Sequence, residues 1–151
     1  MNNGQTIAAT PALPASYAAF VGLDWGDEKH ALSLCAANSS AVERTTLKQT
    51  PEALADWANA LRTRFPNGPI AVALEQARGA LLAGLSQYEH IVPFPVNPKS
   101  LARFREALYP SRSKDDPVDG DLLLEMLLKH RDHLRPWQPD TVANPPVGLA
   151  Q

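Results

Sequence analysis

The chain has 151 residues, a length that suits one domain with a substantial hydrophobic core. Its 44% hydrophobic and 20% charged residues are typical of a globular protein, and no apolar run approaches the ~20 residues that a membrane-spanning helix needs. The net charge of −2 excludes a chain that attracts nucleic acid by its overall charge, and the single cysteine, Cys35, excludes an intrachain disulfide and fits a reducing cytoplasm.

The first half of the chain is predicted to start with a leader and three strands. Residues 1–16 lack the basic and continuous apolar segments of a signal peptide, so we expect a disordered leader there. Apolar runs at 20–23 and 31–36 flank a turn around Gly26, which indicates a hairpin. The alternating segment 41–48 carries two threonines and favours a third strand.

The second half alternates helices and strands. Thr50 as N-cap, Pro51 at the first helical position and Glu52 in the first turn predict the start of a helix that ends at 66–69. Further segments are predicted as strands at 70–74 and 91–96, and as helices at 79–88, from the Asn97 cap to 108, and at 119–130.

This order predicts an α/β fold over residues 17–137, with a five-stranded mixed sheet and helices on its faces. Residues 138–151 are expected to form a frayed, proline-rich tail. The apolar face of the helix at 119–130 is long for one small core. It raises the hypothesis that Met126 and Leu127 contact a second copy or a further domain.

Acidic residues stand at the ends of two predicted strands. Asp24 ends the first and Glu75 ends the fourth, so the two lie side by side if these strands are parallel neighbours. Asp116 and Asp119 are three residues apart at a helix start and share one face of its first turn. Taken singly, each acid also suits an ordinary role in a turn or helix cap, but their joint placement favours a site.

Such a cluster indicates a particular kind of metal site. Carboxylates held a few ångströms apart repel one another unless a cation joins them. Oxygen ligands without a Cys–His set select Mg²⁺ or Mn²⁺ over zinc, and two such ions ~4 Å apart could hold the attacking and leaving oxygens of a phosphodiester. The candidate catalytic residues and metal ligands are Asp24, Glu75, Asp116 and Asp119.

A basic segment precedes the last acids. Residues 99–114 contain five basic residues and one acid, whereas residues 115–125 contain five acids and no base. Arg and Lys make most phosphate contacts, so this segment is a candidate nucleic-acid surface, with a solvated helix beside a charged loop as the alternative. Arg78, just after Glu75, is a candidate for a phosphate contact or a surface salt bridge. The candidate nucleic-acid-binding residues are Lys99, Arg103, Arg105, Arg112 and Lys114.

Four segments together carry a family resemblance: FVGLDWGDEKH, ALEQARG, VNPKSLARF and SKDDPVDGDLL. Their order and spacing, over roughly residues 20–137, resemble the N-terminal domain of DEDD-type bacterial insertion-sequence transposases, relatives of the Piv DNA invertase. That domain is similar to the RuvC resolvase and implies an RNase H-like fold. By this resemblance the DEDD acids fall on Asp24, Glu75, Asp116 and Asp119. The chain departs from the usual motif with Asp115 in place of Thr and Gly120 in place of Ala.

The resemblance implies the catalytic domain of a DNA transposase or recombinase, which uses two Mg²⁺ or Mn²⁺ ions to cleave and transfer phosphodiesters at insertion-sequence DNA. It further implies a bacterial cytoplasmic protein that works as a homo-oligomer, with a structured guide RNA and a C-terminal domain that supplies a nucleophilic serine. This sequence ends before such a domain, so little strand transfer is expected from it alone.

Three other functions stay open. The chain could be a stand-alone RuvC-like nuclease or resolvase, or a non-catalytic nucleic-acid-binding module. An actin-like or sugar-kinase-like ATPase is the third, since GLDWG resembles a first phosphate loop, but a second glycine-rich phosphate motif is missing from the sequence.

Overall fold

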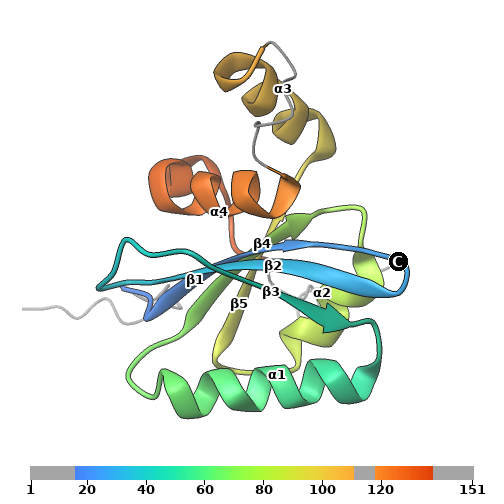
Figure 1. The fold of residues 1–151 in the computed structure, drawn as a ribbon, viewed down its shortest axis with the longest axis vertical. Helices are drawn as coiled ribbons and strands as arrows, with labels where there is room; N and C mark the ends of the chain where they lie inside the picture. The colour runs from blue at the N-terminus through green and yellow to red at the C-terminus, as the bar shows by residue number, and fades with distance from the viewer. Residues whose placement is uncertain (1–15, 111–117, 138–151) are drawn as a thin grey trace, which may run out of the picture.

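A computed structural model describes residues 16–110 and 118–137 of the chain (Figure 1). The predicted order of strands and helices is confirmed, while the predicted leader and proline-rich tail fall in 1–15 and 138–151, outside the described residues. The elements are β1 (Ala19–Asp24), β2 (Lys29–Ala36), β3 (Glu43–Lys48), α1 (Pro51–Arg64), β4 (Ile70–Glu75), α2 (Gly79–Ser86), β5 (Ile91–Val96), α3 (Pro98–Leu108), α4 (Asp119–His130) and a 3₁₀ turn (Arg131–His133).

The strands form the five-stranded mixed sheet that the sequence predicts. Its order is β3-β2-β1-β4-β5. β1 pairs antiparallel with β2, and β2 with β3, whereas β1 and β4, and β4 and β5, are parallel. The sheet has the mixed α/β arrangement expected of an RNase H-like domain, and it makes β1 and β4 direct parallel neighbours.

Local sequence signals set two of the helix starts. The Thr50 side chain accepts a hydrogen bond from the Ala53 backbone N–H at 3.1 Å, and Pro51 stands in the first turn of α1. The Asn97 side chain accepts from the Lys99 N–H at 2.7 Å at the start of α3. No helix in the described part of the chain is long and apolar enough to cross a lipid bilayer.

Helices cover both faces of the sheet, and Figure 1 shows α1 along one face and α4 across the other. Apolar side chains of α1 and α2 pack against one face of β1 and β4, including Val21, Leu23, Val72 and Leu74. Side chains of α4 pack against the other face, which carries Phe20, Ala71 and Ala73. Successive side chains of a strand alternate between faces, so Asp24 and Glu75 belong to the α4 face.

The backbone of α4 rests directly on β1 at Gly22. A Cβ at Gly22 would lie 2.0 Å from the Gly120 carbonyl oxygen and 2.6 Å from the Leu124 backbone nitrogen. Both are backbone atoms, so no side-chain rotation could make room. Glycine at this position therefore allows a closer approach of helix and strand than any other residue would.

A polar anchor fixes the first turn of α4 at the same place. The Ser33 hydroxyl of β2 donates to Asp121 Oδ1 at 2.6 Å. Arg44 of β3 makes a bidentate pair with the same carboxylate, with Nε 3.0 Å from Oδ1 and Nη2 3.1 Å from Oδ2. This carboxylate thus ties α4 to two strands of the sheet.

The packing of α4 overturns one expectation. Met126 and Leu127 are buried within the chain itself, so they are unavailable for a second copy or another domain. The α4 face of the sheet is wide enough to cover them. The neighbouring side chain Leu128 is the exposed one, at 42% of its full accessible area.

The turn between β1 and β2 depends on a buried histidine. His30 is only 3% exposed, and its Nδ1 accepts a hydrogen bond from the Gly26 N–H at 3.2 Å. Burial lowers the pKa of His30 below its ordinary value of 6.5, because the protonated ring would lose its hydration. His30 therefore acts as a neutral acceptor that holds the turn.

The variant Gly22→Ala is expected to lose about 3 kcal/mol or more of unfolding free energy, because its methyl group overlaps the α4 backbone. Gly79→Ala is the matched control: a Cβ there meets nothing within 4 Å, so its stability should equal or exceed that of the parent. Urea denaturation measures both. Equal stabilities for the two variants would contradict the close contact.

His30 also predicts a pH dependence of stability. Its pKa is lower folded than unfolded, so the unfolded state takes up the proton first, and stability falls as the pH drops below 6.5 towards the folded-state pKa. Denaturation curves of His30→Gln between pH 7.5 and 5 should show a smaller decline than those of the parent. The control is His133→Gln, at an exposed histidine, which should keep the parent's decline.

Candidate active site

Asp24 and Glu75 end two adjacent parallel strands. The register of β1 and β4 pairs Val21 with Val72 and Gly22 with Ala73, and its continuation places Asp24 beside Glu75. Both side chains are partly buried and belong to the face that α4 covers. We call this pair of carboxylates, Asp24 and Glu75, the acid pair.

The electrostatic environment of the acid pair is unfavourable for two ionised groups. Burial raises the pKa of Asp24 above its ordinary range, and repulsion from Glu75 raises that pKa further. The positive charges of Arg78 and Arg105 partly offset these effects. An ionised Asp24 therefore lowers the stability of the fold, and the two nearby arginines reduce this loss.

The other two predicted acids come from the chain just before and within α4. Asp119 is the first residue of α4, and its carboxylate forms an ion pair with Arg105 of α3. Asp116 lies outside the described residues. Arg105 therefore affects two of the predicted acids: it forms an ion pair with Asp119, and its charge lowers the pKa of Asp24.

Among the residues that the structure describes, no three His, Cys, Asp or Glu side chains lie close enough together to hold a metal ion. The structure places Asp24 and Glu75 close together, whereas the Asp119 carboxylate forms an ion pair with Arg105.

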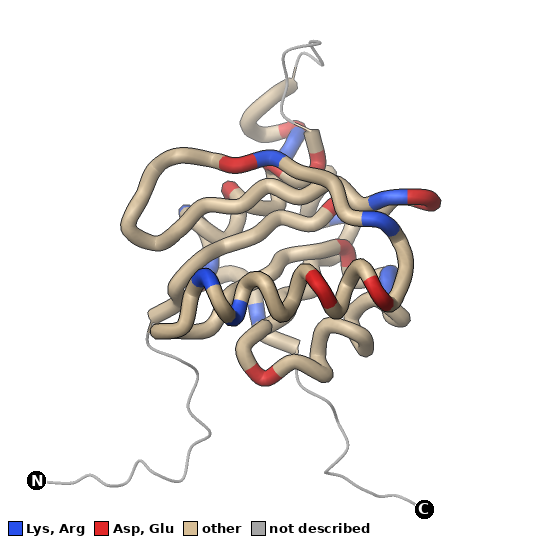
Figure 2. Tube along the Cα trace, turned by 60° about the horizontal axis from the view of Figure 1, so that its bottom comes forward, with Lys and Arg blue, Asp and Glu red and all other residues tan. Residues whose placement is uncertain are grey.

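The candidate nucleic-acid residues divide into three kinds. Lys99 and Arg103 are exposed on α3, one turn apart. Arg105 is engaged with Asp119, so its main described contact is with an acid of the site. Arg112 and Lys114 lie outside the described residues. Figure 2 shows basic and acidic residues interspersed along the described trace.

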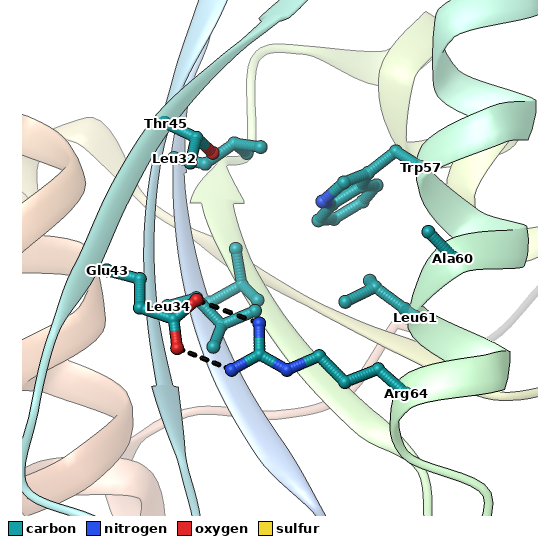
Figure 3. Close-up of a pocket in the computed structure, with 9 residues that line it drawn as sticks. Leu32, Leu34, Glu43, Thr45, Trp57, Ala60, Leu61 and Arg64 are labelled. Carbon is teal, nitrogen blue, oxygen red and sulfur yellow. Dashed lines mark hydrogen bonds and ion pairs between the residues drawn. The ribbon is translucent and has the colours of Figure 1, made fainter.

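A separate cavity of about 180 Å³ lies between the sheet and α1. Figure 3 shows Leu32, Leu34, Trp57 and Leu61 turned towards it, with Arg64 reaching across to the Glu43 carboxylate in a bidentate ion pair. This cavity is on the face opposite the acid pair, and its apolar lining gives it no part in an acidic site.

Comparison with known families decides what kind of domain carries this arrangement. The profile of a family described as transposase, the DEDD type named after IS110, matches residues 21–144. The chain belongs to this family of DEDD transposases. The match includes β1 from Val21 to Asp24, all of β4 and all of α4.

Two curated relatives carry transposase names. The "Mini-circle putative transposase for IS117" of Streptomyces coelicolor is 27% identical over 133 residues, which is 83% of this chain and 31% of that protein. "Putative transposase y4uE" of Sinorhizobium fredii is 26% identical over 111 residues, covering 72% of this chain and 31% of that protein. This DEDD transposase chain thus spans under a third of the length of both relatives.

Sequence reasoning missed the residues that support the acids. Trp25, directly after Asp24, stacks on Arg78, and Asp121 joins α4 to Ser33 and Arg44. The only sequence signal for the contact between Trp25 and Arg78 was the position of a tryptophan directly after Asp24. Nothing in the local pattern distinguishes Asp121 from its acidic neighbours.

Asp24→Asn is expected to raise the free energy of unfolding at pH 7. The folded-state pKa of Asp24 is raised, so the unfolded state releases its proton first, and the cost of ionising Asp24 grows as pH rises from the unfolded-state pKa to the folded-state pKa; the amide avoids this cost. The gain over the parent should shrink as pH falls from the folded-state pKa towards the unfolded-state pKa and vanish below the latter. Urea denaturation at several pH values measures it, with the exposed-acid variant Asp56→Asn on α1 as control. A loss of stability in Asp24→Asn at pH 7 would contradict this account.

Proposed function

We propose that this domain is the metal-dependent catalytic part of a DNA transposase that cleaves and transfers phosphodiesters at the DNA of an insertion sequence. The observation that carries the proposal is the meeting of Asp24 and Glu75 at the ends of adjacent parallel strands, in a chain of the DEDD transposase family. Asp116 and Asp119 are proposed to complete the set of catalytic acids.

The chemistry of the acid pair suits a hard divalent cation. Its carboxylate oxygens are ligands that Mg²⁺ and Mn²⁺ prefer, and the repulsion that raises the pKa of Asp24 is the kind that a bound cation relieves. When bound, one or two such ions would polarise the phosphodiester and lower the pKa of an attacking hydroxyl or water. The position of Asp24 and Glu75 at the ends of adjacent parallel strands supports this role.

Arg105 gives Asp119 a partner in the absence of other cations. The ion pair between them neutralises Asp119, and the charge of Arg105 also lowers the pKa of Asp24. A divalent ion at the acids would compete with Arg105 for this carboxylate, so we propose that Arg105 moves towards the nucleic acid when the site is filled. This would reconcile its place beside Asp119 with the phosphate-binding role expected from the sequence.

The remaining parts of the proposal concern the longer protein. Lys99 and Arg103, exposed on α3, are proposed to contact the nucleic-acid backbone together with Arg112 and Lys114. A structured guide RNA, assembly as a homo-oligomer, a serine-bearing C-terminal domain and a bacterial cytoplasmic location are proposed from the family resemblance.

A non-catalytic nucleic-acid-binding module is the second candidate. The ion pair between Arg105 and Asp119 favours it, because an arginine can replace a metal ion as the permanent partner of an acid. In that case the acid pair would bind no metal ion.

Binding of Mn²⁺ to the chain, followed by electron paramagnetic resonance, separates the two candidates. Asp24→Asn and Glu75→Gln are expected to weaken binding by about tenfold or more, since each removes a charged ligand. Asp56→Asn, which removes an exposed acid from α1, should bind like the parent. Equal affinities in all four proteins, or no binding by the parent, would contradict the catalytic proposal and favour the binding module.

A further inference from the structure

A tryptophan and an arginine meet beside the acid pair. The guanidinium carbon of Arg78 lies 4.4 Å from the centroid of a Trp25 ring. Trp25 follows Asp24 directly, and Arg78 comes three residues after Glu75. Because β1 and β4 are parallel neighbours, their following segments leave the sheet at the same edge and bring the two side chains together.

Backbone hydrogen bonds fix both partners of this stack. The Arg78 N–H donates to the Glu75 carbonyl at 3.1 Å, and the Leu82 N–H donates to the Arg78 carbonyl at 2.9 Å, so Arg78 is held between β4 and α2. On the other side, the Gly26 N–H bonds to the buried His30 and fixes the turn that carries Trp25. The fold therefore holds the backbone of both segments that carry the two side chains.

The charge of Arg78 is near the acids without being paired to them. In the described part of the chain Arg78 takes part in no ion pair within 4.0 Å, and its buried Nε has no hydrogen-bond partner. Its charge nevertheless lowers the pKa of Asp24. A buried donor without a partner is costly and calls for an explanation. The surface salt bridge considered from the sequence does not supply one.

We propose that Arg78, held over the Trp25 ring, binds the phosphodiester group of a DNA strand at the edge of the acid pair. Its Nη groups can approach two phosphate oxygens in the plane of the guanidinium, whereas its Nε is buried. Ionised carboxylates repel a phosphate, and the charge of Arg78, which takes part in no ion pair among the described residues, would offset part of this repulsion. This inference rests on the proposed function and adds to it a DNA-contacting residue and the aromatic platform that positions it.

DNA affinity at several salt concentrations tests the proposal, with a fluorescent duplex and Ca²⁺ present. Arg78→Ala should bind about tenfold more weakly and show a salt slope smaller by about 1, the signature of one lost phosphate contact. Arg78→Lys should restore only part of the affinity, because an ammonium lacks the planar pair of donors. Trp25→Leu should weaken binding with the arginine still in place.

The control is Arg62→Ala, which removes the same charge from an exposed arginine of α1, on the opposite face of the sheet. It should bind DNA like the parent. Equal effects of Arg62→Ala and Arg78→Ala, or an unchanged salt slope in Arg78→Ala, would overturn the proposal.

Nuclear magnetic resonance gives a readout that does not depend on a metal ion. The Nε–Hε signal of Arg78 should shift when a DNA oligonucleotide is added without divalent ions, and that of Arg62 should not. A shift together with no Mn²⁺ binding would uphold this inference while the metal-dependent function fails. Two results would overturn the inference and leave the function standing. One is Mn²⁺ binding with no shift of the Arg78 signal at saturating DNA. The other is a shift of that signal with an RNA oligonucleotide but not with a DNA oligonucleotide.

Discussion

The site depends on the contact between Gly22 and the first turns of α4. A helix can approach a strand this closely only where the strand residue has no side chain, because the Gly120 carbonyl and the Leu124 nitrogen occupy the space of a Cβ. The same contact sets the position of the predicted acids. Asp24 lies two residues beyond Gly22 along β1, and Asp119 directly precedes Gly120 in α4. The contact thus fixes how β1, which carries Asp24, and the start of α4, which carries Asp119, lie relative to each other, and the Asp121 anchor adds contacts from α4 to β2 and β3.

The arrangement of charge around this edge suggests a compromise between stability and function. Burial and the neighbouring Glu75 make an ionised Asp24 unfavourable, and the nearby arginines reduce the cost in different ways. Arg105 is directly paired with Asp119, while Arg78 lies over the Trp25 ring and takes part in no ion pair within 4.0 Å among the described residues. One arginine therefore neutralises an acid of the site, and the other remains available to a ligand. A fold selected for stability alone would have little reason to bury carboxylates at adjacent strand ends.

Much of the fold could be predicted because its signals are local. Thr50 with Pro51 and Asn97 with Pro98 mark helix starts, and the alternation of helices and strands implies the parallel neighbours that bring Asp24 to Glu75. The supporting contacts join residues far apart in sequence, and no local pattern reveals them. The basic residues around Arg105 in the sequence predict a phosphate-binding role, yet Arg105 forms an ion pair with Asp119. In the sequence, Met126 and Leu127 are more apolar residues than one small core needs, yet they are buried in the structure. The width of the sheet face that α4 covers depends on strands far apart in the sequence, so no local pattern predicts it.

Asp24 and Glu75, with Asp116 and Asp119, are proposed to form a site for divalent metal. A crystal of the chain soaked in Mn²⁺, with anomalous difference density measured at the ends of β1 and β4, tests this directly. We expect one or two peaks within coordination distance of the Asp24 and Glu75 carboxylates, with Arg105 displaced from Asp119. An ordered site with no peak, and with Arg105 still paired to Asp119 at saturating Mn²⁺, would contradict it.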